Sequence, residues 1–201
     1  LVWALDERQT LSADVQFMKQ PDTPRYDELV AGYGQSEPSS SVFQYQPLER
    51  LFAHASYEID EPIRGVRALD LDVSYQRIRD DRRTRAYPSP QNEYEFREHN
   101  TSELMGLVLD GLSEPNEIIQ LHWGGDVYLD WVSSSRTRRQ VSSNDVEPWS
   151  PRFPDGSRMD SYGLYADAEV EVLSTLSLSG GIRFSYFKTT LAQRDIEPLI
   201  E

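Results

Sequence analysis

The sequence contains no cysteine and only three histidines among its 201 residues. The absence of cysteine excludes disulfides, thiolate metal sites and cysteine nucleophiles. No apolar run approaches the roughly 18 residues that a membrane-spanning helix needs. Basic residues are also scarce, because 20 Lys and Arg stand against 34 Asp and Glu and leave a formal net charge of −14. This balance excludes nucleic acid as a partner, since phosphate backbones are bound by clustered basic residues.

The most abundant pattern is strict alternation of apolar and polar residues. In residues 162–190, Leu164, Val170 and Ile182 belong to the apolar series, while Glu169 and Arg183 lie in the polar series. A period of two predicts β-strands, here a hairpin of two strands. Further strands are predicted at residues 9–20, 49–60, 65–79, 103–113 and 118–133, with residues 1–5 as part of an eighth. Seven strands of this length exceed the five or six residues typical of soluble sheets.

The connections between these strands differ in length in a regular order. Tight connections are expected at residues 6–8, 61–64, 114–117 and near Ser174, and long ones at 21–48, 80–102 and 134–160. Outer-membrane barrels have short periplasmic turns and long extracellular loops. The sequence therefore predicts an all-β fold, an antiparallel up-and-down transmembrane β-barrel segment with long extracellular loops. An open sheet edge is not stable in lipid, so the barrel is expected to be larger than this chain.

Two other interpretations remain open on the pattern alone. A soluble acidic antiparallel β-sandwich that acts as a binding module also alternates, because one face of its sheet is wet. A passive porin-like barrel shares the strands and turns but uses no energy coupling. No catalytic arrangement is found, because pairs such as Asp70 and Asp72 follow strand spacing on a polar wall, and no nucleophile elbow or phosphate loop is present.

Several stretches resemble a known family when they are taken in order. DSYGLYADAEVEVLSTLSLSGGIRFSYF (160–187) resembles a barrel hairpin of TonB-dependent outer-membrane receptors. TPRYDELVAGYG (23–34), LDLDVSYQRIRDDRRTR (69–85) and NTSELMGL (100–107) are similar to other strands of that family, especially its haem and haemoglobin branch. The resemblance implies that residues 1–201 are a partial barrel domain, about seven strands of a barrel of 22.

The same resemblance implies a function. Receptors of this family import an iron chelate, haem or a ferric siderophore, across the bacterial outer membrane, and they are not enzymes. The TonB complex supplies the energy through a plug domain, and no plug is recognised in these residues. The resemblance implies outer-membrane lipid, lipopolysaccharide, the iron chelate and the TonB complex as partners, with no resident cofactor or metal.

Candidate ligand contacts come from basic, aromatic and histidine residues near the long connections. Arginines cluster at 77–85 and at 136–139, where they could meet a chelate, lipopolysaccharide phosphates or only solvent. His99 is expected in a long loop, where its imidazole could ligate haem iron. The predicted ligand-binding residues are His99, Arg82, Arg83, Arg85, Tyr33, Tyr45 and Trp149.

The apolar series of each strand predicts the face that contacts lipid. Arginine there is expected to be costly, with Val127 as a lipid-facing position and Asp126 as its counterpart toward the lumen. The predicted lipid-facing residues are Leu69, Leu71, Val73, Trp123, Val127, Leu129, Leu164, Val170 and Ile182.

Overall fold

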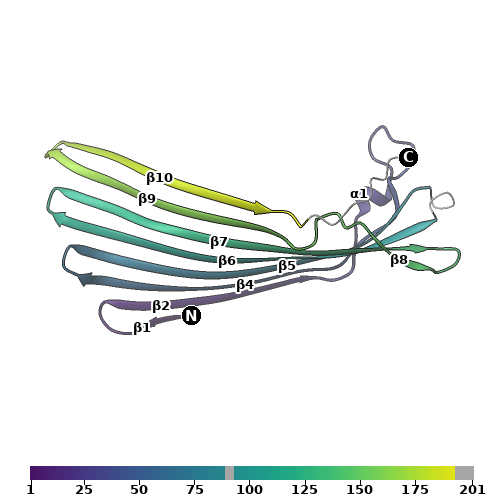
Figure 1. Cartoon of the computed structure of the whole chain (residues 1–201), viewed down its shortest axis with the longest axis horizontal. Helices are drawn as coiled ribbons and strands as arrows, with labels where there is room; N and C mark the ends of the chain where they lie inside the picture. The colour runs from purple at the N-terminus through teal and green to yellow at the C-terminus, as the bar shows by residue number, and fades with distance from the viewer. Residues whose placement is uncertain (89–92, 193–201) are drawn as a thin grey trace.

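The protein is described by a computed structural model over residues 1–88 and 93–192, in which the strands form one antiparallel sheet (Figure 1). Its long strands are β2 (Gln9–Gln20), β4 (Ser40–Ile63), β5 (Val66–Ala86), β6 (Tyr94–Asn116), β7 (Ile119–Gln140), β9 (Ser157–Leu173) and β10 (Leu176–Thr190). The short elements are β1 (Val2–Ala4), β3 (Thr23–Pro24), β8 (Val146–Trp149) and the single-turn helix α1 (Tyr26–Leu29). The seven long strands and the short strand β1 near the N-terminus agree with the predicted strands.

The sheet has up-and-down topology. Its order is β1-β2-β4-β5-β6-β7-β9-β10, with β3 beside β4 and β8 beside β7. The tight turns lie together at one end of the sheet, and the longer connections with α1 and β8 lie at the other (Figure 1). These are called the short-turn end and the loop end. Gly65 closes the turn between β4 and β5 with a φ of 88°, a conformation that glycine adopts without steric cost. A tight turn occurs near each predicted place, although β4 and β6 continue into two of the predicted turns, which lie instead at residues 64–65 and 117–118.

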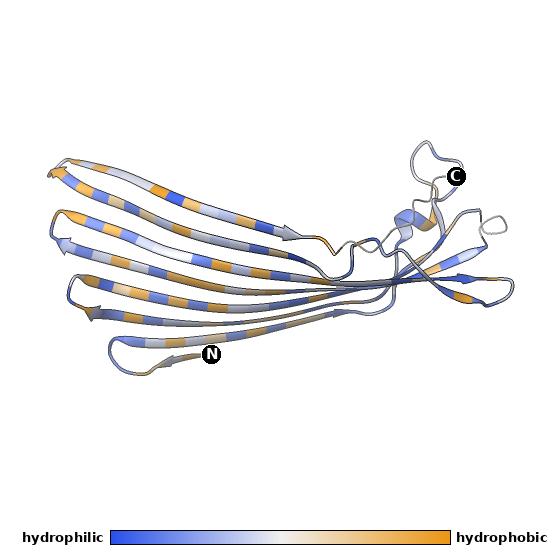
Figure 2. Ribbon diagram, viewed as in Figure 1, coloured by the Kyte–Doolittle hydropathy of each residue, from blue (hydrophilic) through white to orange (hydrophobic). Residues whose placement is uncertain are grey.

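The register places the apolar series of neighbouring strands on one face. Leu71 lies opposite Tyr57 and Leu109, whereas Asp70 lies opposite Glu58 and Asp110. Figure 2 shows the resulting alternation of apolar and polar residues along the strands. We call the two sides of the sheet the apolar face and the polar face. Each name applies to the whole side, including its two ends.

The apolar face is uncovered in this chain. Ile182 is 77% exposed and Val15 is 71% exposed. Among the described residues, Phe43 is the only buried hydrophobic side chain, and it is 8% exposed. An apolar surface of this extent marks contact with another protein or a membrane. Within residues 1–88 and 93–192, no helix has the length and apolar character needed to cross a membrane.

The predicted long connections are present but shorter than expected, the one between β5 and β6 most of all. β4 begins at Ser40, β5 continues to Ala86, β6 begins at Tyr94 and β7 continues to Gln140, so residues 40–48, 80–86, 94–102 and 134–140 belong to strands. The pattern missed these extensions because Arg, Glu and Ser occupy both faces there, and apolar alternation is lost. Backbone pairing continues without it, helped by cross-strand ion pairs.

Candidate functional site

At the loop end, the polar face carries charged and aromatic side chains in register across five strands. One row consists of Tyr45, Arg82, Glu98, Arg136 and Trp149, each directly opposite the next. The adjacent row consists of Phe43, Thr84, Phe96, Arg138 and Glu147. Directly opposed residues in a sheet lie close enough for their side chains to interact. Residues more than 100 positions apart in the chain therefore form one surface, which we call the loop-end surface.

Guanidinium groups lie over the aromatic rings of this surface. Arg138 stands 3.7 Å from the ring centroid of Trp149, and Arg136 stands 4.1 Å from that of Phe96. Arg82 lies 5.4 Å from the centroid of Tyr45. Such stacking holds a cation in place while its edge remains able to donate hydrogen bonds. The surface thus combines aromatic rings with fixed guanidiniums, of which Arg138 is paired with Glu147 and Arg82 with Asp80.

A single buried carboxylate organises the centre of the loop-end surface. Glu98 is 2% exposed, and its oxygens lie 3.0 Å from Nε of Arg136 and 3.7 Å from Nε of Arg152. Among residues 1–88 and 93–192, no second carboxylate pairs with either guanidinium, so two positive charges share one negative charge. Burial lowers the pKa of Arg136, and the nearby Arg152 lowers it further against the opposing effect of Glu98. An added anion would therefore be favoured here.

The structure brings three of the seven predicted ligand residues together and separates the others. Tyr45, Arg82 and Trp149 share one row of the loop-end surface. The opposite face of the sheet carries Arg83 and Arg85 of β5 and His99 of β6. His99 was expected in a loop; it lies instead within strand β6. Tyr33 lies fully exposed in the connection after α1.

Two members of the loop-end surface, Phe96 and Glu98, were missed by sequence reasoning, as was Arg152. The signal for the first two was present, because no glycine or proline interrupts residues 93–105. Continuing the strand period through His99 would have placed Phe96 and Glu98 on one face. Arg152 follows Pro151 in an irregular connection and carried no such signal.

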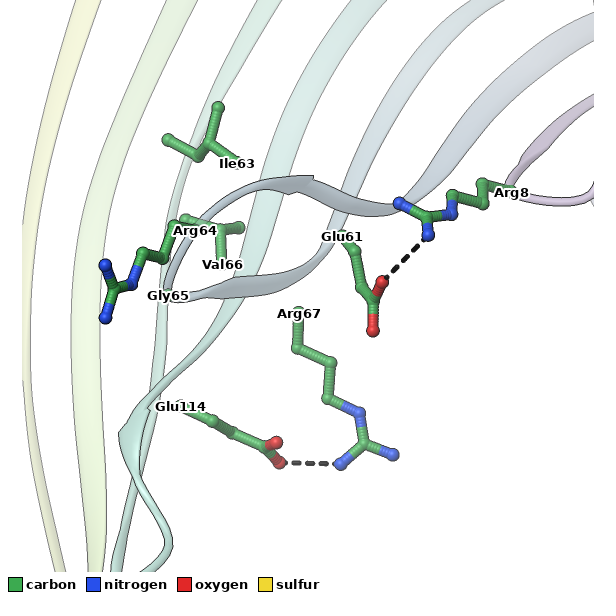
Figure 3. Close-up of a pocket in the computed structure, with 8 residues that line it drawn as sticks. All are labelled: Arg8, Glu61, Ile63, Arg64, Gly65, Val66, Arg67 and Glu114. Carbon is green, nitrogen blue, oxygen red and sulfur yellow. Dashed lines mark hydrogen bonds and ion pairs between the residues drawn. The ribbon is translucent and has the colours of Figure 1, made fainter.

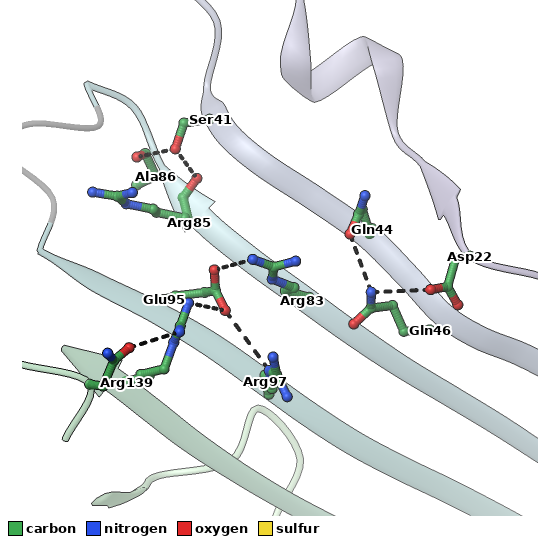
Figure 4. Close-up of polar contacts among 11 residues, drawn as sticks. Asp22, Ser41, Gln44, Gln46, Arg83, Arg85, Ala86, Glu95, Arg97 and Arg139 are labelled. Carbon is green, nitrogen blue, oxygen red and sulfur yellow. Dashed lines mark hydrogen bonds and ion pairs between the residues drawn. The ribbon is translucent and has the colours of Figure 1, made fainter. Parts of the chain in front are cut away.

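The opposite face of the same strands holds a second buried carboxylate. Glu95 is 3% exposed and is surrounded by Arg83 at 2.7 Å, Arg139 at 3.2 Å and Arg97 at 3.8 Å (Figure 4). Burial by itself raises the pKa of Glu95, but Arg83 and Arg139 outweigh this effect and hold the pKa below its ordinary value of 4.5. The carboxylate therefore stays ionised and fixes the arginines around it.

This depressed pKa predicts a pH dependence of stability. Glu95 stabilises the folded protein fully above its unfolded pKa, and the contribution is lost as the pH falls through the lower folded pKa. We expect Glu95→Gln to lower the free energy of unfolding at neutral pH, because three guanidiniums lose their counterion. The difference in unfolding free energy between the variant and wild type should narrow once the pH falls below about 4.5, and close as the pH passes the lower pKa of the folded protein. Unfolding titrations of both proteins from neutral to acidic pH test this, and a difference that stays constant with pH would contradict it.

Comparison with known families identifies the chain. The family described as TonB dependent receptor-like, beta-barrel, matches residues 2–196. The chain belongs to this TonB-dependent receptor family. Comparison with curated protein sequences finds no match.

Solved receptor structures support the same fold. The structure titled copper transporter OprC is 10% identical, with a TM-score of 0.71, and the alignment covers 96% of this chain and 28% of that one. P. aeruginosa FpvA bound to heterologous pyoverdines is 13% identical, with a TM-score of 0.61 and coverage of 96% and 30%. The FpvAI–pyocin S2 complex is 12% identical, with a TM-score of 0.60 and the same coverage. The chain thus spans about 30% of the length of these proteins, and its sheet is a segment of a receptor barrel.

The predicted lipid-facing residues of this TonB-dependent receptor segment all lie on the apolar face. Leu69, Leu71 and Val73 of β5 lie on the same face as Trp123, Val127 and Leu129 of β7 through the intervening residues of β6. Leu164, Val170 and Ile182 continue that face on β9 and β10. Contact of this face with lipid stays a prediction.

The short-turn end of the receptor segment contains a shallow hollow lined by residues of β4, β5 and the turns. It has a volume of about 520 Å³ and is open to solvent (Figure 3). Arg8 pairs with Glu61 at 3.4 Å, and Arg67 pairs with Glu114 at 2.7 Å. These exposed pairs tie neighbouring turns together and contribute little stability each.

Proposed function

We propose that this chain is part of an outer-membrane receptor that imports an anionic ferric chelate, and that the loop-end surface contacts the chelate. The apolar face would lie in the lipid, and the polar face would line the lumen of the barrel. The loop end would then be extracellular. On this proposal, residues 1–201 form part of the barrel domain.

The observation that carries this proposal is the sharing of Glu98 by Arg136 and Arg152. The unbalanced positive charge lies beside rings stacked under guanidiniums, and this combination suits a flat anionic ligand. The titles of the similar structures name a copper transporter and a complex of FpvA with pyoverdine and iron, so both concern a metal. We favour a ferric siderophore over haem because His99, the predicted haem ligand, lies on the face opposite the loop-end surface.

The import step would draw its energy from the TonB complex acting through a plug domain, as in other receptors of this family. A passive porin-like barrel would need no such coupling. Uptake that stops when the proton-motive force is collapsed would therefore support the receptor. Continued uptake would contradict it.

Trp149→Leu tests the role of the loop-end surface. Losing the ring that supports Arg138 should weaken chelate binding by about three- to tenfold, the usual range for one aromatic contact. The complete protein would be produced in iron-starved cells that lack other receptors, and uptake of radioactive iron would be measured from pyoverdine, a catecholate and haemin. The matched control is Trp131→Leu, which removes the same ring from the apolar face of β7. Equal losses in both variants, or import of none of the chelates by wild type, would contradict the proposal.

A further inference from the structure

The centre of the loop-end surface is occupied by a carboxylate of the protein itself. Glu98 of β6 lies directly opposite Arg82 on one side and Arg136 on the other. Arg152 reaches it from the connection between β8 and β9. Only 2% of Glu98 is exposed, because the side chains around it cover it. A ligand that approaches this surface therefore meets guanidiniums whose counterion is already in place.

Glu98 neutralises its partners without the hydrogen bonds that would fix them. Its Oε2 lies 3.7 Å from Nε of Arg152, which is beyond hydrogen-bonding distance. This oxygen and the Nε atom of Arg136 are both buried, and neither has a hydrogen-bond partner among the described residues. Buried polar atoms without such partners are costly. The two ion pairs of Glu98 are therefore held by charge, and the longer one, with Arg152, is the weaker.

Arg136 is held in place by other contacts as well. Its guanidinium stands 4.1 Å from the ring centroid of Phe96, a stacking arrangement that does not depend on Glu98. Its backbone lies within β7, between β6 on one side and β8 on the other. We therefore expect Arg136 to keep its orientation when Glu98 carries no charge.

Arg152 lies on a segment that is fastened at both ends and free in its middle. At one end, β8 pairs with β7 through Trp149. At the other end, Asp155 accepts a hydrogen bond from the backbone N–H of Ser134 at 2.9 Å. Within residues 1–88 and 93–192, the side chain of Arg152 has Glu98 as its one ion-pair partner, and it is 45% exposed. Turning Arg152 from Glu98 toward solvent therefore breaks one long ion pair and nothing else.

We propose that Glu98 is a built-in competitor for the anionic ligand of the loop-end surface: it occupies the empty site, and the ligand takes Arg152 from it. The carboxylate groups of a ligand would accept hydrogen bonds from the exposed edge of Arg152, which Glu98 does not do at 3.7 Å. Glu98 would stay paired with Arg136, so its buried charge keeps a counterion throughout. The inference rests on the proposed function, because it takes the loop-end surface as the ligand site.

The test measures binding of citrate to the complete protein in detergent by isothermal titration calorimetry, at low ionic strength because salt screens exposed charges. Citrate is a tricarboxylate without iron, and triethyl citrate has the same skeleton without the charges. The variants are Glu98→Gln, Arg152→Gln and the double variant. The control is Asp81→Asn, which removes a carboxylate that is also 2% exposed but is held by Arg79 on the opposite face.

We expect Glu98→Gln to bind citrate about tenfold more tightly than wild type, because an internal carboxylate no longer competes for a charge-assisted hydrogen bond. Arg152→Gln should bind citrate about tenfold more weakly, since that hydrogen bond is lost. The double variant should lose most of the gain. Glu98→Asp keeps the charge and should bind as wild type does, as should Asp81→Asn. Triethyl citrate should not distinguish the proteins.

Weaker citrate binding by Glu98→Gln, or no binding at all, would overturn the proposal, because Glu98 would then serve to position the arginines. A full gain in the double variant would show that Arg152 is not the residue exchanged. An equal gain in Asp81→Asn would trace the effect to net charge. If circular dichroism shows that Glu98→Gln does not fold, Arg152→Gln decides alone, and unchanged citrate binding by that variant rejects the exchange.

Uptake of ferric chelates by the same proteins separates this result from the proposed function. Citrate binding that responds to Glu98 and Arg152 as expected, without uptake of any chelate, would reject the receptor function and leave the competition standing. Chelate uptake without any effect of these two residues on citrate binding would do the reverse.

Discussion

Leu107→Arg is expected to lower the free energy of unfolding of the complete protein by about 2–4 kcal/mol, the cost of arginine at a lipid-facing position near the bilayer midplane. Leu107 is 46% exposed on the apolar face and lies between Val73 and Val127 on the neighbouring strands. A guanidinium there would find no polar partner across either strand. Denaturant unfolding of the protein in lipid vesicles, followed by tryptophan fluorescence, measures the effect.

The matched control is Val108→Arg, one residue further along the same strand. Val108 lies on the polar face between Asp72 and Asp126, so a new guanidinium meets two carboxylates. We expect little loss of stability. Asp126 itself, which the sequence suggested as the position to compare with Val127, is unsuitable because it already pairs with Arg183 at 2.5 Å. Equal destabilisation by the two arginines would contradict the assignment of the faces.

Gly124→Ala is expected to cost about 1–3 kcal/mol, the range for overpacking a site that has no free space. The ring of Tyr165 in β9 crosses over Gly124 in β7, and its hydroxyl donates a hydrogen bond to Asp110 in β6, on the other side of β7. A methyl group at Gly124 would overlap the carbonyl oxygen of Leu109 and the Tyr165 hydroxyl. The backbone must then shift, and the hydrogen bond is lost. Thermal or denaturant unfolding of the complete protein measures the loss.

Gly180→Ala provides the comparison, because a Cβ at that position meets no atom within 4 Å. The substitution restricts the unfolded chain without creating a clash, so its effect should be neutral or slightly stabilising. If both alanines destabilise the protein equally, the cost comes from strand geometry in general and not from the packing of Tyr165 on Gly124.

The middle of the sheet was predictable because one of its faces is apolar. Alternation located β5 through Leu69, Leu71 and Val73 and assigned the intervening Asp70 and Asp72 to the other face. The register later placed the apolar series of all the long strands on one face. The tight turn before β5 was likewise predicted, at residues 61–64, and the structure places it at residues 64–65.

The loop end was not predictable by the same argument. Residues 80–86 and 94–102 are polar on both faces, so nothing in their pattern separates a strand from a loop. The arginines at 82 and 83 looked like one cluster, yet a single step along a strand turns a side chain to the opposite face. Arg82 therefore joins the loop-end surface, and Arg83 lies on the opposite face.

The sequence by itself determined the all-β class, the seven long strands and the division of their middle portions into two faces. These follow from the period of two, which is a property of the extended backbone and needs no partner strand. The tertiary structure alone decided how far the strands continue and which distant residues meet. Tyr45, Glu98 and Trp149 share a row only because the register of successive strands aligns them. Register depends on pairing between strands, and a pattern within one strand does not contain it.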